Sequence, residues 1–476
     1  MTPVNDTKQI QHMRQILLWP VYFLPLDDNS KITSRWESIS TPASNNPWRE
    51  VDDEFGDPSE FQERHYNEFI SFLPPVQRFL YGQGLGHAVK KGYGESPIRI
   101  LRRTDISRAR VTLERDGPSL ELIVKHVDLY FFYDIDVVIL ALEVFCNDLP
   151  LNIAQELLLR FGRTYPSYWD SDTRGGHCPW RVEWLSEDGT VLSVSDYENK
   201  EKYLSFVCKH RAPAISSHWE FLLSPMVLYH SEKIGDLRYR QLEYYRMPQM
   251  VYLSVDNPSE LSRADYIRLG FGSGAGEGDQ LPFSSNYLKE FEERYCYDRN
   301  FRVEHSEHHN EARFIASGYA LALVESSDGE VVSISNNRLF EQFRHQYFLM
   351  FLIAHFQKAS LRMFSDRLVA SVSQLQVNHT QSETDFRINF RLSHENFLRF
   401  SHRYWYHEIA NHGQMRELFD MTREHLFLDA LYQEVREELS DMGRFLDDEA
   451  MRRQNETVIR LTVVTTFGLM GSITSG

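Results

Sequence analysis

The stretch from Leu461 to Gly476 contains no charged residue, although the residues before it have the charge density of a water-exposed helix. No proline occurs after Arg338, so the preceding helical pattern runs into this stretch without a break. As a helix, residues 458–476 would be about 28 Å long, close to the ~30 Å hydrocarbon core of a bilayer. The pattern predicts a transmembrane helix over 458–476, and a buried core helix is the alternative.

Small and hydroxyl side chains gather on one side of this helix when it is drawn at about 100° per residue. Such a stripe suits a helix that packs closely against others or lines a water-filled path. Three arginines precede the helix, and the positive-inside rule therefore places the bulk of the chain in the cytoplasm. The residues predicted to line a pore are Leu461, Thr465, Gly468, Leu469 and Ser472.

The rest of the chain has a globular composition, with 42% hydrophobic and 25% charged residues. Its formal net charge of -17 argues against nucleic-acid binding, which needs concentrated lysine and arginine. The four cysteines form no CxxC pair, so neither a structural zinc site nor a disulfide framework is expected.

Residues 1–337 are predicted to form an α/β (α+β) cytoplasmic domain. Residues 16–26 indicate a strand, and "DVVILALEVF" indicates a strand that is buried on both faces. "NDLPLNIAQELLLRFGR" indicates a helix, and the Asp-Gly pairs at 188–189 and 328–329 indicate hairpins.

Residues 338–457 are predicted to be helical and to end in a long stalk helix, with Gly413 as the candidate break between it and an earlier helix. "YFLMFLIAHF" at 347–356 is too short to span a membrane and is assigned to a buried helix. The stalk has a narrow apolar seam of the coiled-coil kind, and we expect identical chains to cover it. The seam residues are Leu431, Val435, Leu439, Met442 and Leu446.

Two motifs have a possible chemical meaning, and each is assigned to a loop. "EHSEHHNEAR" at 304–313 would place two histidines on one helical face, but it lacks the HExxH pattern and suits a solvated loop. "GFGSGAGEGD" at 270–279 matches neither phosphate-binding pattern and suits a flexible surface loop. No nucleophile or kinase signature is present, so we predict that the protein is not an enzyme and has no catalytic residues.

The order of an α/β domain, a long stalk and "RRQNETVIRLTVVTTFGLMG" resembles the CorA-like divalent metal-ion transporters over roughly residues 428–476. The resemblance implies a pentamer in the cell inner membrane whose first transmembrane helix lines a pore for magnesium or another divalent cation. The Gly-Met-Asn signature and the second helix of that family are absent, which implies a C-terminally truncated member. The alternative is a non-conducting, membrane-anchored or cytosolic regulatory or interaction protein.

The acids Asp447, Asp448 and Glu449 are predicted to bind a regulatory divalent cation between neighbouring stalks, where like charges would otherwise repel. The alternative is a solvated acidic turn that Arg452 and Arg453 balance. No other cofactor is expected. The predicted partners are further copies of the chain, a lipid bilayer and divalent cations.

Overall fold

The computed structural model divides the chain into two compact units. The α/β unit comprises Met1–Ser360 and Arg403–Leu428, and the helical unit comprises Leu361–His402 and Asp429–Gly476. The structure describes residues 8–24, 36, 39, 46–51, 62–82, 97–133, 135–171, 174–233, 237–242, 245–276, 278–301, 312–327, 338–373 and 380–474.

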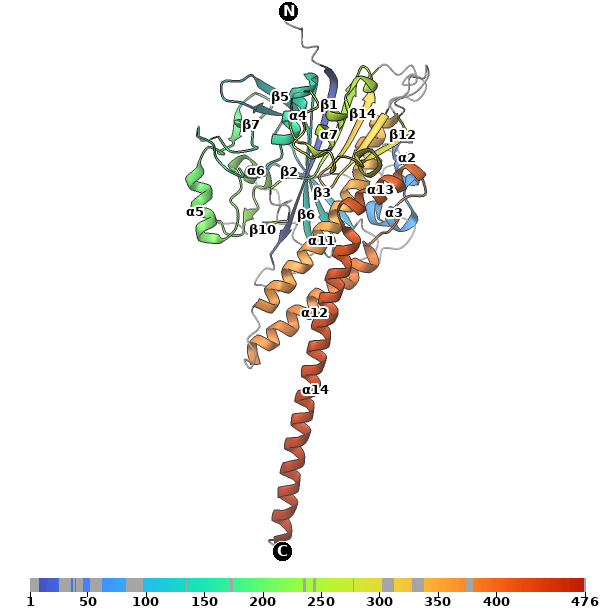
Figure 1. Cartoon of the computed structure of the whole chain (residues 1–476). Helices are drawn as coiled ribbons and strands as arrows, with labels where there is room; N and C mark the ends of the chain where they lie inside the picture. Colours follow the sequence, from blue (N-terminus) through green and yellow to red (C-terminus); the bar gives the residue numbers. More distant parts are fainter. Residues whose placement is uncertain are drawn as a thin grey trace, which may run out of the picture. The chain divides into compact units, whose positions relative to one another are not determined.

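The α/β unit is built on one large sheet (Figure 1). Its longest path runs in the order β12-β13-β14-β11-β1-β6-β5-β4-β7-β8, with β3 also on β5, β2 on β3, β10 on β1, and β9 on β10. Only the β11–β14 and β9–β10 pairs among the described strands are parallel. The strands are β1 (Gln9–Phe23), β2 (Trp48–Glu50), β3 (Ile98–Arg103), β4 (Arg108–Thr112), β5 (Ser119–Phe132), β6 (Ile135–Pro150), β7 (Arg181–Leu185), β8 (Val191–Val194), β9 (Val227–Leu228), β10 (Arg238–Gln241), β11 (Gln249–Val255), β12 (Cys296–Asn300), β13 (Ala312–Ala316) and β14 (Ala320–Ser326).

Strands β1 and β6 form the centre of the sheet, and their apolar runs are buried on both faces. β1 is buried continuously from Met13 to Phe23 even though Pro20 lacks a backbone donor. Pairing with β11 ends at Leu17 and pairing with β10 begins at Val21, so Pro20 lies where no ladder bond on that side is needed.

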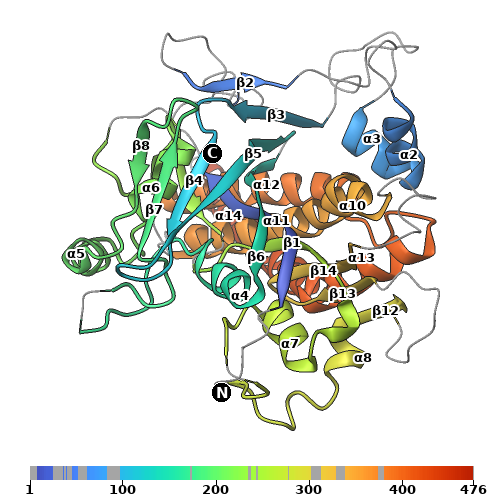
Figure 2. The same ribbon diagram turned by 90° about the horizontal axis from the view of Figure 1, so that it is seen from above.

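Helices cover the two faces of this central pair (Figure 2). On one face, Leu17 and Trp19 belong to a core that includes residues of α4, α6 and α7. On the other face, Phe340 packs on His12 and Phe348 packs on Tyr130. The helices of this unit are α2 (Glu63–Ser71), α3 (Pro74–Tyr81), α4 (Leu151–Arg160), α5 (Lys200–His210), α6 (Ser217–Leu223), the short η2 (Pro258–Glu260), α7 (Arg263–Phe271), α8 (Phe291–Tyr295), α10 (Arg338–Gln342), the π-helical η3 (Phe343–Tyr347), the first half of α11 (Phe348–Ser373) and α13 (Gly413–His425).

The helical unit consists of the second half of α11, α12 (Thr380–Arg403) and α14 (Leu428–Thr474). α12 turns its aromatic residues Phe386, Phe390, Phe397 and Phe400 inward. Phe364 of α11 packs edge-on against Phe397, with their ring centroids 5.6 Å apart. The aromatic spacing of three and four residues is that of a helix with one buried face.

Most local predictions are confirmed, and the membrane prediction is wrong. The strands at 16–26 and in "DVVILALEVF", the helix in 151–160, the 188–189 hairpin and the buried helix at 347–356 are all present. The 328–329 hairpin and most of "EHSEHHNEAR" lie outside the described residues. Among the described residues, no helix is both long and apolar enough to cross a membrane, which contradicts the transmembrane helix at 458–476. The physical reason is that the charged Arg460 lies inside the predicted span, where a membrane helix needs a predominantly apolar run.

Candidate functional site

The N-terminal half of α14 is packed inside its own unit. Phe397 of α12 stacks on Tyr432 with the ring centroids 5.5 Å apart, and Val435 and Leu439 are 2% and 4% exposed. A Cβ on Gly443 would lie 3.7 Å from Phe390, so α12 also follows α14 to that point. Two of the five predicted seam residues, Val435 and Leu439, are therefore buried within the chain's own helical unit. Leu431, Met442 and Leu446 are half-buried, and their contact with identical chains stays a prediction.

Beyond Leu446, α14 presents apolar side chains to solvent. Met451 is 57% exposed, Val458 is 55% exposed and Ile459 is 62% exposed, and Phe445 just before them is 48% exposed. Met451 and Val458 are seven residues apart, so they lie on one face of the helix. Single exposed apolar residues are ordinary, but a run of them on one extended helix is typical of an association surface.

The predicted metal ligands do not converge. Asp447 and Asp448 are exposed, and Glu449 accepts a hydrogen bond from Arg452 at 2.9 Å. Successive helical residues point about 100° apart, so these three carboxylates cannot surround one ion within a single chain. Among the described residues, no group of three His, Cys, Asp or Glu side chains is placed to hold a metal. The predicted ion site lies between neighbouring stalks, so both this site and the solvated acidic turn stay predictions.

The predicted pore residues lie on α14, whose backbone is helical through Thr474. The side chains of Leu461, Thr465, Gly468, Leu469 and Ser472 lie outside the described residues. Their role, the pentamer, the inner-membrane location and the divalent cation stay predictions from the sequence.

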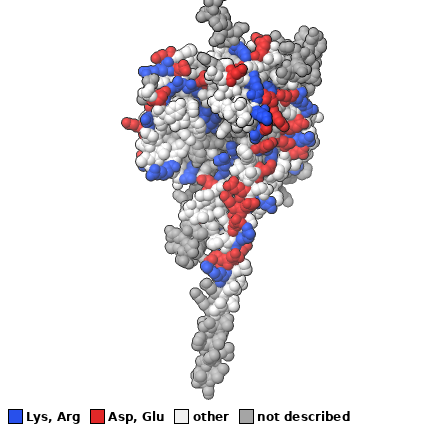
Figure 3. Space-filling view, viewed as in Figure 1, with Lys and Arg blue, Asp and Glu red and all other residues white. Residues whose placement is uncertain are grey.

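An acidic face extends along the packed half of α14 (Figure 3). Glu434 and Glu438 are one helical turn apart, and Asp441 continues the run. Partial burial, and then the Glu434 charge, raise the pKa of Glu438. Because the arginines at 452, 453 and 460 follow this run, α14 changes from acidic to basic along its length.

The α/β unit contains a buried charged layer that sequence reasoning missed. Arg14 of β1 and Arg344 of η3 both donate to Oε1 of Glu143 on β6, the latter at 3.0 Å. His126 of β5 lies 3.9 Å from the other carboxylate oxygen. The sequence does indicate this layer, because Arg14 and Glu143 each interrupt an apolar run. A charge buried within such a run needs a partner of opposite charge. π-helical turns such as η3 often occur at functional sites.

The histidines of this layer favour their neutral forms. Burial, opposed by the Asn147 hydrogen bond, lowers the pKa of His12, and burial followed by the Arg102 charge lowers the pKa of His126. The charged groups of this layer are therefore its arginines and Glu143. Phe340 and Phe145 close over Arg14, which is only 7% exposed, so the layer stabilises the sheet and offers no open chemical site.

A second polar cluster has the residue types of a hydrolase but lacks access. Ser216 Oγ lies 2.9 Å from both Asp196 Oδ1 and His218 Nδ1. Ser216 and His218 are fully buried, and burial lowers the pKa of His218 to about 3. A nucleophile needs an adjacent base and a path for substrate, and this cluster has no such path. The hydrogen bonds of this cluster instead hold the turn before α6 in position.

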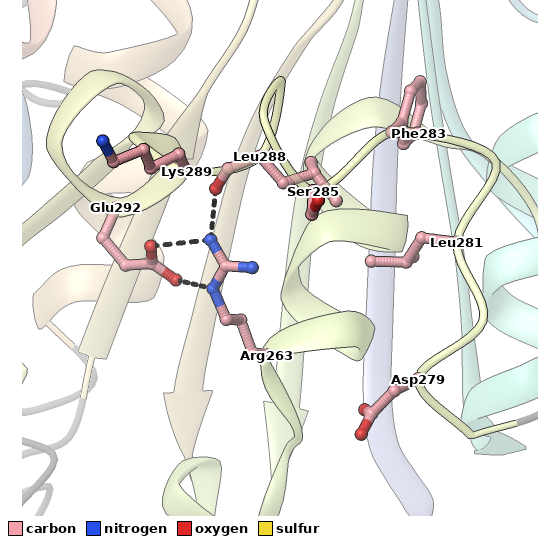
Figure 4. Close-up of a pocket in the computed structure, with 8 residues that line it drawn as sticks. All are labelled: Arg263, Asp279, Leu281, Phe283, Ser285, Leu288, Lys289 and Glu292. Atoms are coloured by element: carbon pink, nitrogen blue, oxygen red, sulfur yellow. Dashed lines mark hydrogen bonds and ion pairs between the residues drawn. The ribbon is translucent and has the colours of Figure 1, made fainter.

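An open hollow of about 630 Å³ lies beside α7 and α8 (Figure 4). Arg263 and Glu292 form a two-point ion pair across it, with nitrogen–oxygen distances of 2.6 and 3.0 Å. Their charges therefore satisfy one another, and the lining residues contain no nucleophile paired with a base. The lining residues are Arg263, Asp279, Leu281, Phe283, Ser285, Leu288, Lys289 and Glu292.

Comparisons with known proteins add no assignment: no protein-family model, curated protein or solved structure matches this chain.

Proposed function

We propose that this chain is a non-conducting interaction protein that associates with copies of itself through the distal part of α14. The observation that carries the proposal is the exposure of Met451, Val458 and Ile459 on α14, beyond Gly443, where α12 still packs against this helix. Full burial of each such side chain contributes roughly 1.5–3 kcal/mol, and a second copy of the same helix offers a matching apolar face.

Charge places a condition on this association. Each chain has a formal net charge of -17, and the acidic half of α14 would repel the same half of a parallel copy. Beyond residue 450, α14 instead carries three arginines, at 452, 453 and 460, and one glutamate, at 456, so contacts limited to this stretch keep the acidic halves apart. Added salt should therefore strengthen association, because it screens like-charge repulsion more than it weakens apolar contact.

The test is the oligomeric state of the full chain by sedimentation across a micromolar range. Wild type is expected to associate, and Met451→Glu/Val458→Glu is expected to be monomeric with an unchanged circular dichroism spectrum. Gln433→Glu/Ser440→Glu is the matched control, since it adds the same charge to exposed positions of the packed half of α14. A monomeric wild type, or equal weakening by both pairs of substitutions, would overturn the proposal.

A further inference from the structure

Two arginines of the α/β unit lie opposite one another on neighbouring backbone segments, and no described carboxylate forms an ion pair with either. Arg163, which follows α4, and Arg246, which precedes β11, form an isolated antiparallel bridge. Residues directly opposite in such a bridge have their side chains on the same face, close together. Two like charges in this position destabilise a fold unless something neutralises them.

Arg163 is held in place by its Nε and by an aromatic ring. It is 5% exposed, its Nε donates to the backbone oxygen of Leu159 at 2.8 Å, and its guanidinium lies 4.4 Å from the centre of the Tyr245 ring. Within the described residues, the side chain makes no ion pair and no other hydrogen bond. Its backbone oxygen accepts from Tyr197 and Trp219, which fixes the position of the residue.

Arg246 is also fixed and also lacks a counter-charge in the described structure. Its Nη1 donates to the Phe271 oxygen at 2.8 Å, and its Nη2 is buried without a hydrogen-bond partner. Burial, and then the charge of Arg163, lower the pKa of Arg246 to about 9, so it is still a cation at neutral pH. Within the described residues, no carboxylate offsets the energetic cost of this buried cation.

Gly272, in the described part of the glycine-rich run (270–276 and 278–279), packs against Arg246. A Cβ on Gly272 would lie 1.8 Å from Arg246 Nη2, and Gly272 has a φ of +51°, so this position requires glycine. Arg268 donates to the oxygens of Gly278 and Gln280, and Glu156 accepts from the Ala275 amide. The described part of the run is therefore hydrogen-bonded to α4 and α7. Ala275, Gly276, Gly278 and Asp279 are exposed, as a surface loop predicts, and the flexibility of this loop stays a prediction.

Aromatic side chains connect the arginines to the surface. The Arg246 guanidinium lies 5.3 Å from the centre of the Tyr319 ring, and Tyr319 is 55% exposed. His177 Nδ1 lies 2.6 Å from the hydroxyl of Tyr245, and His177 is itself exposed. A planar ligand group can stack on such rings while its charged group meets the guanidiniums.

We propose that Arg163 and Arg246 bind the phosphate group of a small phosphorylated molecule. Paired guanidiniums match the geometry of a phosphate, whose oxygens accept several charge-assisted hydrogen bonds at once. One such group supplies the missing counter-charge for both arginines and accepts from the unpartnered Nη2. The proposal is independent of α14 and of self-association.

The test uses the full chain, purified without phosphate, in equilibrium dialysis and thermal unfolding. The probes are inorganic phosphate, adenosine monophosphate and adenosine, with chloride added to equal ionic strength. Both phosphate probes are expected to bind and to raise the melting temperature of wild type, whereas adenosine is not. Tighter binding of adenosine monophosphate than of inorganic phosphate would assign the aromatic rim to the ligand's ring. Equal binding would assign the site to the phosphate group alone.

Arg246→Met separates a ligand site from a structural one. Without phosphate, this variant is expected to melt at a higher temperature than wild type, because it removes one of two opposed buried cations. Its affinity for phosphate is expected to fall by at least about tenfold, since charge-assisted hydrogen bonds are lost. A purely structural arginine would instead give a lower melting temperature and an unchanged response to phosphate.

Arg263→Met is the matched control, because Arg263 already has Glu292 as its partner and its loss should leave phosphate binding unchanged. Gly272→Ala supplies a second variant at the site itself, since its methyl group would displace the Arg246 guanidinium. Absence of phosphate binding by wild type overturns the proposal. So does a response to phosphate that Arg246→Met and Gly272→Ala both retain in full.

Discussion

Replacing Glu143 by glutamine is expected to destabilise the α/β unit strongly. The carboxylate side chain is 10% exposed, and it is the common acceptor for Arg14 and Arg344, whose side chains are 8% and 18% exposed. Glutamine keeps the shape but leaves two buried guanidiniums without a counter-charge. Breaking a buried ion pair on one side costs about 3–5 kcal/mol, and we expect a loss of that size.

The measurement is urea denaturation followed by tryptophan fluorescence, which reports on the fully buried Trp19 of the neighbouring strand β1. Glu121→Gln is the control, because Glu121 also bridges two arginines, Arg108 and Arg110, but its side chain is 45% exposed. Exposed pairs contribute about 0–1 kcal/mol, so this control should change the free energy of unfolding little. Similar losses in the two variants, or a loss below about 1 kcal/mol for Glu143→Gln, would refute the reasoning.

The same layer predicts a dependence on pH. Burial alone would raise the pKa of Glu143, but the charges of Arg344 and Arg14 outweigh it and lower the pKa below its ordinary 4.5. A lowered pKa means that the stabilisation is fully present above 4.5 and is lost as the pH falls through the folded-state value. Wild type should therefore lose stability in acid below pH 4.5, and Glu143→Gln should show less of that loss.

Three further outcomes are expected. In wild type, the melting temperature should be the same in magnesium as in a chelator, and the same should hold for Asp447→Asn/Asp448→Asn. A shift between the two conditions that only wild type shows would support the metal site. Asp196→Asn should cost about 2 kcal/mol at neutral pH, because burial alone would raise the pKa of Asp196 but Lys202 and its other donors hold it at about 2, against an ordinary 3.8. That contribution should fade in wild type as the pH falls from 3.8 towards 2, and a flat profile would contradict it. Phe397→Ala should cost about 3–5 kcal/mol in the helical unit and lower its helix content on heating, measured by circular dichroism; an unchanged melting curve would contradict the packing of α12 on α14.

The sequence predicted those elements whose cause is local. β1 and β6 follow from apolar runs too continuous for a half-exposed strand, and α4 follows from its amphipathic spacing. The start of α4 was less well placed, because Asn147 and Asp148 look like helix caps but β1 extends β6 through them to Pro150. Pairing with a distant strand thus overrode a local capping signal.

The charged layer and the arginine pair follow from contacts between residues far apart in the chain. Arg14 and Glu143 each look anomalous in the sequence, yet nothing local says that they lie opposite one another. Arg163 and Arg246 are ordinary surface residues by type, and only the bridge between their backbones makes them a pair. Spacing within one segment cannot show such a pair, because the sheet order determines it.

The stalk shows what an amphipathic pattern does and does not establish. Its apolar seam correctly predicted a helix with one covered face, since Val435 and Leu439 are buried. The pattern did not identify the covering element, and α12 of the same chain covers the face that identical chains were expected to cover. A periodic seam is equally compatible with both partners, because each buries the same side chains. The evidence for a second copy must therefore come from apolar residues that the chain leaves uncovered, and on the described part of α14 these include Phe445, Met451, Val458 and Ile459.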